Sequence, residues 1–375
     1  MVEKYEIFIK KIIICNISLI LLYNVKLVKH EIQEFEDEFV EEIQKTFEKN
    51  NKVNINEIEK KIYKNNLIFK DVKSEINIGF TLDPKYLLQT IMTTTSIMAT
   101  QKNNTKIRFH FGVTRNFNSK HMIKIYDLRN KINNLTEFNF YYLKGAMEKM
   151  KHFHYSGEAC PGKFELPELL PDDIERLIIF DAGDVLILRD LSELYNYNMK
   201  HFWALAPPEP ICIKHTKRVN ITKYLNIGSI LLNVKELKRN KFWDLYTKNK
   251  NIQKGGQPDQ TLFNILLPDD KKDYFPFRFG SISIICNDKD SDKMRYKDYN
   301  FVEWFNSNLS LTFPENPKSE IGILAQGYNP LFIHQFCDKW EKGKGISIYR
   351  HLAKYFINLT GIQKEFCKYL PGYCL

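Results

Sequence analysis

Runs of β-branched and aromatic residues recur along the chain from residue 76, and stretches with helical spacing of apolar positions separate them. The runs Ile76–Thr81, Ile107–Val113 and Phe138–Tyr142 predict strands. The stretches Tyr86–Met98 and His121–Ile132 predict the helices between them. Strands that alternate with helices form a mostly parallel sheet with helices on its faces. The pattern therefore predicts an α/β fold with a central mostly parallel sheet.

A further apolar run, Leu177–Phe180, stops at Asp181, and a second carboxylate, Asp184, follows before the apolar pattern resumes at Val185. Ligands bind open α/β sheets beyond the carboxyl ends of the strands, which is where these two acids fall. Two neighbouring carboxylates need a cation or a proton to relieve their repulsion. We expect a divalent metal ion there, with chemistry on a phosphate-containing substrate.

The second half of the predicted sheet follows these acids. Leu191–Tyr195 predicts a short helix, Tyr224–Asn233 predicts a strand, and Gly255–Gln260 predicts a loop that opens a helix ending at Leu266. No Gly-x-Gly-x-x-Gly sequence follows the first strand, so a dinucleotide-binding loop is not predicted. We expect one catalytic domain over residues 74–375.

The N-terminal residues carry a different pattern. Lys10 and Lys11 precede an apolar stretch over residues 12–28, and this order is typical of a signal peptide or signal anchor, which we predict for residues 1–29. Asn16 and Asn24 favour a buried helix as the alternative. Residues 30–73 are strongly charged and predict a charged helical stem or, equally well, a helix packed on the main domain. The apolar positions of that helix are Ile32, Phe35, Phe39, Ile43 and Phe47.

Composition narrows the class of protein. A content of 43% hydrophobic and 14% aromatic residues supports a globular core. The net charge of +10 comes without a long basic block, so we predict no nucleic-acid partner. The chain has 7 cysteines and no Cys-x-x-Cys, which argues against a zinc ribbon. The six cysteines after Cys15, together with several Asn-x-Ser/Thr triplets typical of a glycoprotein, favour an ER or Golgi membrane protein with a lumenal catalytic domain (type II), or secretion as the second choice.

Two classes of enzyme use such an acid pair. In haloacid dehalogenase-type phosphohydrolases the first Asp attacks phosphorus and a second, two residues later, acts as acid and base. Here the spacing is three, and at least three predicted strands precede a loop that this family places on its first strand. In a nucleotide-sugar transferase, the two acids hold a metal that bridges the donor diphosphate and stabilises charge on the leaving nucleotide.

The transferase hypothesis predicts further ligands downstream. His334 follows an apolar run, and a His beside carboxylates favours Mn²⁺ over Mg²⁺. Lys339 supplies a point charge for a phosphate group. We therefore expect Asp181, Asp184 and His334 to be the metal ligands, with Lys339 on the diphosphate.

Six blocks in order from residue 76 to residue 340 resemble glycosyltransferase family 8, the retaining family that includes glycogenin and the bacterial lipopolysaccharide galactosyltransferases. The resemblance implies a Rossmann-like GT-A glycosyltransferase fold. It implies that the block with Thr81 holds the nucleoside, with Asp83 toward the uracil and Tyr86 stacking on it, and that Lys163 contacts the donor. The family's Asp-x-Asp makes Asp184 the safer ligand.

Asp181 joins the site only if Gly183 absorbs one extra residue as a bulge, which glycine permits. In two later blocks the resemblance implies that Asn226 and Asp259 bind sugar hydroxyls and that Gly228 lets the donor approach the backbone. It also places Gln260 near the anomeric carbon.

These inferences converge on a metal-dependent retaining glycosyltransferase that uses Mn²⁺ (or Mg²⁺). We expect it to move a hexose or pentose from a nucleotide-sugar donor, a UDP-sugar, to a glycan or glycoprotein acceptor. We favour same-face attack by the acceptor over a covalent intermediate on Asp259. The alternatives are a donor-binding pseudoenzyme of the same fold and the phosphohydrolase.

Overall fold

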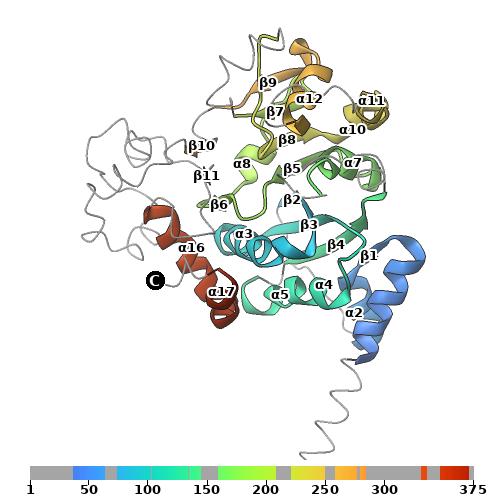
Figure 1. The fold of residues 1–375 in the computed structure, drawn as a ribbon, viewed down its shortest axis with the longest axis vertical. Coiled ribbons are helices and arrows are strands. Elements are labelled where there is room, and N and C mark those ends of the chain that lie inside the picture. The colour runs from blue at the N-terminus through green and yellow to red at the C-terminus, as the bar shows by residue number, and fades with distance from the viewer. Residues whose placement is uncertain are drawn as a thin grey trace, which may run out of the picture.

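The computed structural model describes residues 37–63, 74–102, 104–133, 135–144, 159–207, 221–249, 258–276, 279–283, 331–335 and 347–370. Its centre is an eight-stranded sheet in the order β1-β4-β3-β2-β5-β8-β7-β9 (Figure 1). The strands are β1 (Lys52–Asn54), β2 (Ser74–Leu82), β3 (Thr105–Val113), β4 (Thr136–Tyr142), β5 (Arg176–Phe180), β7 (Ala204–Ala206), β8 (Ser229–Asn233) and β9 (Lys272–Tyr274). The four central strands β4, β3, β2 and β5 are parallel, which confirms the predicted α/β sheet.

One face of the parallel strands is apolar and carries the larger core. The helices on this face are α3 (Leu87–Thr100), α4 (Ser119–Tyr126) and α5 (Leu128–Lys131), which match the predicted helices (Figure 1). Phe80, Phe109, Phe111 and Phe138 alternate with polar residues along β2, β3 and β4, and their rings stack with centroids 5.5–6.4 Å apart. Period-two alternation therefore aligns the aromatic side chains of neighbouring strands on one side of the sheet.

The second core lies around β5 and β8. The helices there are α7 (Gly162–Leu169), α10 (Val234–Arg239), α11 (Phe242–Lys248) and α12 (Pro258–Leu266), with the short α8 (Ser192–Tyr195) and the 3₁₀ turns η1 (Pro84–Tyr86) and η2 (Asp269–Lys271). Phe164 of α7 stacks on Phe263 of α12 with ring centroids 4.6 Å apart. This aromatic contact joins the first half of the domain to the helix that carries Asp259 and Gln260.

A second, three-stranded sheet differs from the single sheet expected from sequence. It consists of β10 (Gly280–Ser283), β11 (Phe332–Gln335) and β6 (Val185–Ile187) in the order β10-β11-β6. The acidic turn after β5 ends the strand, so the apolar residues that follow form β6 in a different sheet. β11 pairs antiparallel with β6, and this pairing brings the C-terminal part of the chain to the acidic residues.

Residues 37–50 form a helix that leads into β1 and α2 (Ile55–Tyr63) at the β4 edge of the sheet (Figure 1). Phe39, Ile43 and Phe47 of this helix are buried in the main core, so over the described part of 30–73 the chain packs on the domain, the second of the two interpretations left open. The predicted segment 1–29 lies outside the described residues. Among the described helices, none is long and apolar enough to cross a membrane.

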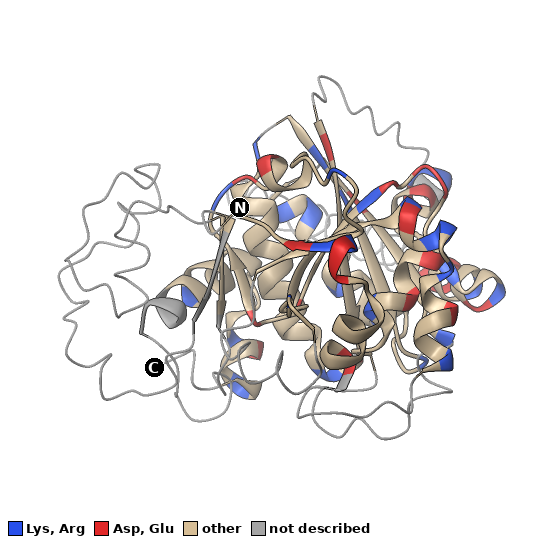
Figure 2. Ribbon diagram, turned by 90° about the horizontal axis from the view of Figure 1, so that it is seen from above, with Lys and Arg blue, Asp and Glu red and all other residues tan. Residues whose placement is uncertain are grey.

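Two C-terminal helices, α16 (Ser347–Thr360) and α17 (Gln363–Tyr369), complete the described chain, and α16 packs against α3. Basic and acidic residues are interspersed over the described ribbon in Figure 2. Among the described cysteines, Cys367 is in a disulfide bond.

Candidate active site

The acidic residues at the end of β5 lie in a tight turn rather than in a paired strand. The Asp181 N–H donates to the carbonyl of Gly228 at 2.8 Å, and the Asp184 N–H donates back to the Asp181 carbonyl at 3.3 Å. Gly183 lies between them with φ of 76°, a left-handed conformation that glycine adopts without a steric penalty. The extra residue is therefore absorbed in the turn, and both carboxylates stay at the carboxyl end of the sheet.

Two side chains of helix α3 form hydrogen bonds with the backbone of this turn and of β6. The Thr93 Oγ1 accepts a hydrogen bond from the Gly183 N–H at 2.9 Å and donates one to the Val185 carbonyl at 3.0 Å. One turn further on, Ser96 Oγ accepts from the Ile187 N–H at 3.0 Å. The sequence analysis did not name Thr93 and Ser96 as positioning residues. The pattern that indicates them is a group of Thr and Ser residues within a helix that is otherwise mostly apolar.

His334 completes a candidate metal centre. The register of β11 against β6 places His334 opposite Val185, the residue after Asp184. The ligand atoms of Asp181, Asp184 and His334 all lie within 4.8 Å of one another, with His334 buried and the two carboxylates half-buried. Two carboxylates and one imidazole are a donor set that suits Mn²⁺ and related divalent ions.

Lys163 on α7 forms an ion pair with Asp181 from inside the protein. Its side chain is 5% exposed and also faces Asp259. Burial opposes the ammonium charge, but Asp181, Cys160 and Asp259 together outweigh it and raise the pKa of Lys163. Burial likewise raises the pKa of Asp259, and Lys163 only partly offsets it. Lys163 therefore stays charged between two acids at the base of the site.

The predicted sugar-binding residues lie on two adjoining segments. Gln260 Oε1 accepts from the Ile227 N–H at 3.1 Å, and Asn226 Oδ1 accepts from the Gly228 N–H at 2.9 Å. Asn264, one turn along α12, bonds both backbone groups of Leu225 at 2.7 and 2.9 Å. Polar side chains of α12 thus hold the backbone that precedes β8, so Gln260 has a structural contact beside its predicted place near the anomeric carbon.

Gly228 makes room for the metal ligands themselves. A Cβ at this position would overlap the imidazole Cε1 of His334 and lie 2.6 Å from Asp181 Oδ2. From sequence, Gly228 was predicted to let the donor approach the backbone. The structure shows that Gly228 also leaves room for the side chains of His334 and Asp181. No other residue type fits without displacing one of them.

The predicted nucleoside block follows β2 toward the same end of the sheet. Asp83 accepts a hydrogen bond from the Lys85 N–H at 3.1 Å and begins η1, which leads to Tyr86. Burial raises the pKa of Tyr86 to about 12, and the charges of Cys160, Asp83, Asp184 and Asp181 add to the shift. Tyr86 therefore interacts electrostatically with the acidic pair. Thr81 is half-buried near the end of β2, and Lys339 lies outside the described residues.

The fold has clear counterparts among solved structures. The galactosyltransferase LgtC, in complex with donor and acceptor sugar analogs, superposes with a TM-score of 0.55 at 15% identity over 79% of this chain and 100% of that chain. The apo bifunctional glycosyltransferase WbbM superposes with a TM-score of 0.58 at 15% identity over 79% of this chain and 52% of that chain. No curated protein matches the chain. The architecture is thus that of a glycosyltransferase with the GT-A fold.

Comparison of the sequence with family models assigns the chain to a family within this fold. The model of glycosyl transferase family 8 matches residues 77–293, more than half of the chain. The protein belongs to glycosyltransferase family 8, as the ordered blocks indicated, and it is a glycosyltransferase.

Proposed function

We propose that this protein is a divalent-metal-dependent retaining glycosyltransferase that takes its sugar from a UDP-linked donor. The observation that carries the proposal is the convergence of Asp181, Asp184 and His334, whose ligand atoms lie within 4.8 Å of one another at the carboxyl end of the sheet. Bound there, Mn²⁺ (or Mg²⁺) would act as a Lewis acid on the donor diphosphate. The acidic turn is reshaped by Gly183 but still presents both carboxylates, which argues against a pseudoenzyme.

The residues around the metal ligands bind different parts of the donor. Asp83 and Tyr86, in the same block as Thr81, hold the nucleoside, and Lys339 contributes charge to the diphosphate. The side chain of Lys163 is 5% exposed and carries a positive charge. It is placed to bind the donor when a metal ion also interacts with the carboxylate of Asp181. Asn226 and Asp259 bind sugar hydroxyls, and Gly228 and Gln260 shape the pocket around the reacting carbon.

Retention of configuration follows from attack of the acceptor hydroxyl on the face from which UDP departs. Asp259 is the carboxylate suggested as a covalent nucleophile, but burial raises its pKa and Lys163 engages its charge. A carboxyl group in this state is a weak nucleophile. Chemical trapping of a glycosyl-Asp259 adduct would contradict same-face attack.

The acceptor and the compartment form a second part of the proposal. The N-terminal segment 1–29 acts as a signal anchor or signal peptide, and the catalytic domain works in the ER or Golgi lumen on a glycan or glycoprotein. Expression of the tagged full chain, with carbonate extraction and protease protection of the membranes, tests this. A tag accessible on the cytosolic side at the C-terminus would contradict the lumenal orientation.

Donor hydrolysis is the sharpest test of the activity. A panel of UDP-hexoses and UDP-pentoses is incubated with the full chain and Mn²⁺ or Mg²⁺, and UDP release is measured. We expect metal-dependent release from one donor, abolished by EDTA and by Asp184→Asn, but unchanged in Asp172→Asn, whose side chain is fully solvent-exposed on the surface. Donor binding without UDP release would identify a pseudoenzyme, and phosphate release from simple phosphomonoesters would favour the phosphohydrolase.

A further inference from the structure

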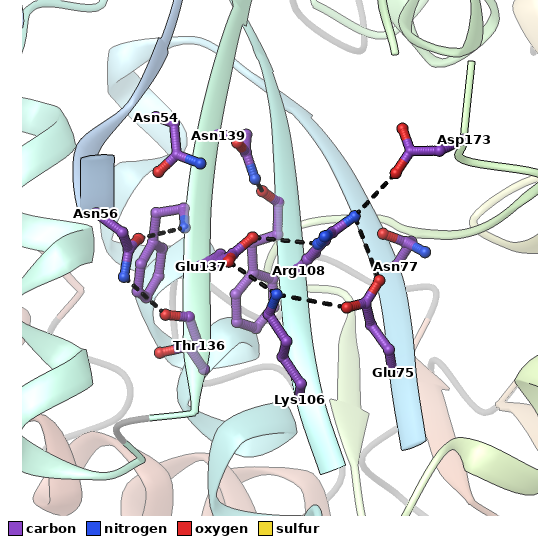
Figure 3. A network of polar contacts seen from close by, with 12 residues as sticks. Asn54, Asn56, Glu75, Asn77, Lys106, Arg108, Thr136, Glu137, Asn139 and Asp173 are labelled. Atoms are coloured by element: carbon purple, nitrogen blue, oxygen red, sulfur yellow. Dashed lines mark hydrogen bonds and ion pairs between the residues drawn. The ribbon is translucent and has the colours of Figure 1, made fainter. Parts of the chain in front are cut away.

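The second face of the parallel strands is polar, which is unusual for a parallel sheet because both faces are normally apolar and covered. Side chains at alternate positions of β2, β3 and β4 are neighbours on this face. In the strand register, Asn77 is paired with Arg108, and Arg108 is paired with Glu137. Figure 3 shows this face, with polar groups from all three strands directed toward one another. The catalytic site uses none of them.

A cavity with a volume of about 420 Å³ opens on this polar face. Its floor is formed by β3 and β4, one wall by residues 46–60 of the N-terminal helices and β1, and the other by residues 171–174 after α7. In the strand register, Arg108 of β3 is aligned with Leu177 of β5, two strands away. Leu177 precedes Asp181 by four residues. At about 3.3 Å per residue and 4.8 Å per strand, Arg108 is roughly 16 Å from the metal centre. The cavity is therefore separate from the donor site.

Ion pairs hold the floor of the cavity in one arrangement (Figure 3). Arg108 contacts Glu75 at 3.3 Å, Glu137 at 3.1 Å and Asp173 at 3.3 Å. Lys106 contacts Glu137 at 2.8 Å and Glu75 at 3.4 Å. A network of this kind is a poor source of net stability because its charges lose hydration. It does fix its side chains in advance, and pre-organised groups lower the entropy cost of binding a ligand.

The lining carries no excess of charge. Three cationic side chains (Lys52, Lys60 and Arg108) face three anionic ones (Glu57, Glu137 and Asp173). His110 is uncharged at neutral pH because burial lowers its pKa to about 3. The remaining polar lining consists mainly of amides and hydroxyls, from Thr46, Asn50, Asn54, Asn56, Asn139 and Tyr141. Such a cavity offers no preference for a phosphate or a metal ion.

Two groups of the floor are placed to meet a ligand. Asn139 Nδ2 donates to the Phe109 carbonyl at 3.2 Å, which uses one of the four hydrogen bonds that an amide side chain makes. The Tyr141 hydroxyl bonds His110 Nδ1 at 3.1 Å and has capacity for a further bond. Amide, hydroxyl and paired charged groups at fixed positions match the alternating donors and acceptors of vicinal hydroxyls.

We propose that this cavity is a second carbohydrate-binding site, which holds a neutral sugar unit of one or two residues away from the catalytic centre. The volume is within the 300–1,000 Å³ typical of small-ligand pockets. In a glycosyltransferase such a site would anchor a distant part of a glycan chain. The inference stands on the cavity and does not require the proposed donor or metal.

The test measures sugar binding by the full-length Asp184→Asn chain, so that the metal centre plays no part. Saturation-transfer NMR is run with neutral mono- and disaccharides of glucose, galactose, mannose and N-acetylglucosamine. We expect one of them to bind, and Tyr141→Phe and Asn139→Ala to weaken it at least about fivefold, equal to the loss of one hydrogen bond. Tyr142→Phe is the matched control, because the hydroxyl of that neighbouring residue accepts from Arg115 Nε and does not line the cavity.

Thermal unfolding of each variant shows that it is folded before its binding is compared. Failure of every sugar in the panel to bind would overturn the proposal. So would binding that neither cavity variant weakens, or binding to the parent chain that UDP displaces in the presence of Mn²⁺. Absence of UDP release by the parent chain in the donor assay, with sugar binding intact, would instead contradict the proposed function and leave this site in place.

Discussion

Thr93 and Gly183 are joined by a hydrogen bond of 2.9 Å from the glycine N–H to the threonine hydroxyl. The same hydroxyl donates to Val185 on the far side of Asp184, so one buried side chain of α3 spans the turn that carries the metal ligands. The longer acidic motif thus depends on a helix about 90 residues earlier in the chain, as well as on the flexibility of glycine. We expect the position of both carboxylates to depend on this hydroxyl.

Thr93→Val removes both hydrogen bonds while keeping the shape of the side chain. We expect Mn²⁺ affinity, measured by titration calorimetry, to fall about tenfold, or ~1.4 kcal/mol. Thr93→Ser should restore most of it. Thr95→Val is the control on the same helix, because within the described structure its buried hydroxyl has no hydrogen-bond partner. Equal loss in both valine variants would mean that the effect is general destabilisation.

Gly228→Ala places a methyl group against both His334 and Asp181. We expect Mn²⁺ binding to fall by more than about tenfold, because an overpacked site shifts ligands by a few tenths of an ångström or more. Ser229→Ala, at the next residue, removes a buried hydroxyl that has no partner in the described structure and should bind metal normally. Normal metal binding by Gly228→Ala, with loss of donor binding alone, would support the original assignment of this glycine to the donor.

Lys163→Met separates metal binding from donor binding. Lys163 pairs with Asp181 in this structure and so competes with a cation at that carboxylate. We expect the variant to bind Mn²⁺ at least as tightly as the parent, and UDP-sugar roughly tenfold more weakly, as for a lost charge-assisted contact. Lys235→Met, whose side chain is 70% exposed, is the control. Weaker Mn²⁺ binding in Lys163→Met would show that the lysine supports the metal site rather than competing with it.

His110 predicts a pH dependence of stability. Burial, with a contribution from Arg108, lowers its pKa to about 3 in the folded chain, whereas an exposed histidine has a pKa of about 6.5. Between these values the unfolded chain binds a proton that the folded chain does not, so the free energy of unfolding falls as pH falls below 6.5. The slope is about 1.4 kcal/mol per pH unit for one group.

Urea unfolding at pH 7 and pH 5 measures this loss. We expect about 2 kcal/mol less stability at pH 5 from His110 alone. His110→Gln, which keeps a hydrogen-bonding side chain, should lose about that much less than the parent over the same interval. The carboxylates titrate equally in both chains, so an identical pH dependence of the two would rule out a neutral buried His110.

Local patterns were sufficient to predict most of the regular elements. The period-two aromatic runs predicted β2, β3 and β4, and the apolar run before Asp181 predicted β5, because alternation and strand propensity are local properties. They were not sufficient for the three-stranded sheet. Pairing between β6 and β11 joins residues almost 150 positions apart, and no periodicity within either segment encodes its partner.

The candidate site divides in the same way. Asp181, Asp184, His334, Gly228 and Lys163 were all named from sequence, and the structure brings them together. Asn226, Asp259 and Gln260 lie on adjoining segments beside them. The order of blocks supplied those names, whereas the hydroxyl of Thr93, the ion pair of Lys163 and the polar cavity over β3 and β4 depend on contacts between distant segments.

By itself, the sequence determined an α/β chain, its two acidic residues at a strand end, and its family. Tertiary structure decided that an inserted glycine still leaves Asp181 in the site, that residues 37–63 pack on the domain, and that the second face of the sheet holds a polar cavity. The physical reason is that residue types set local backbone preference and charge. The distances between charges and the space around them are set only when the whole chain packs.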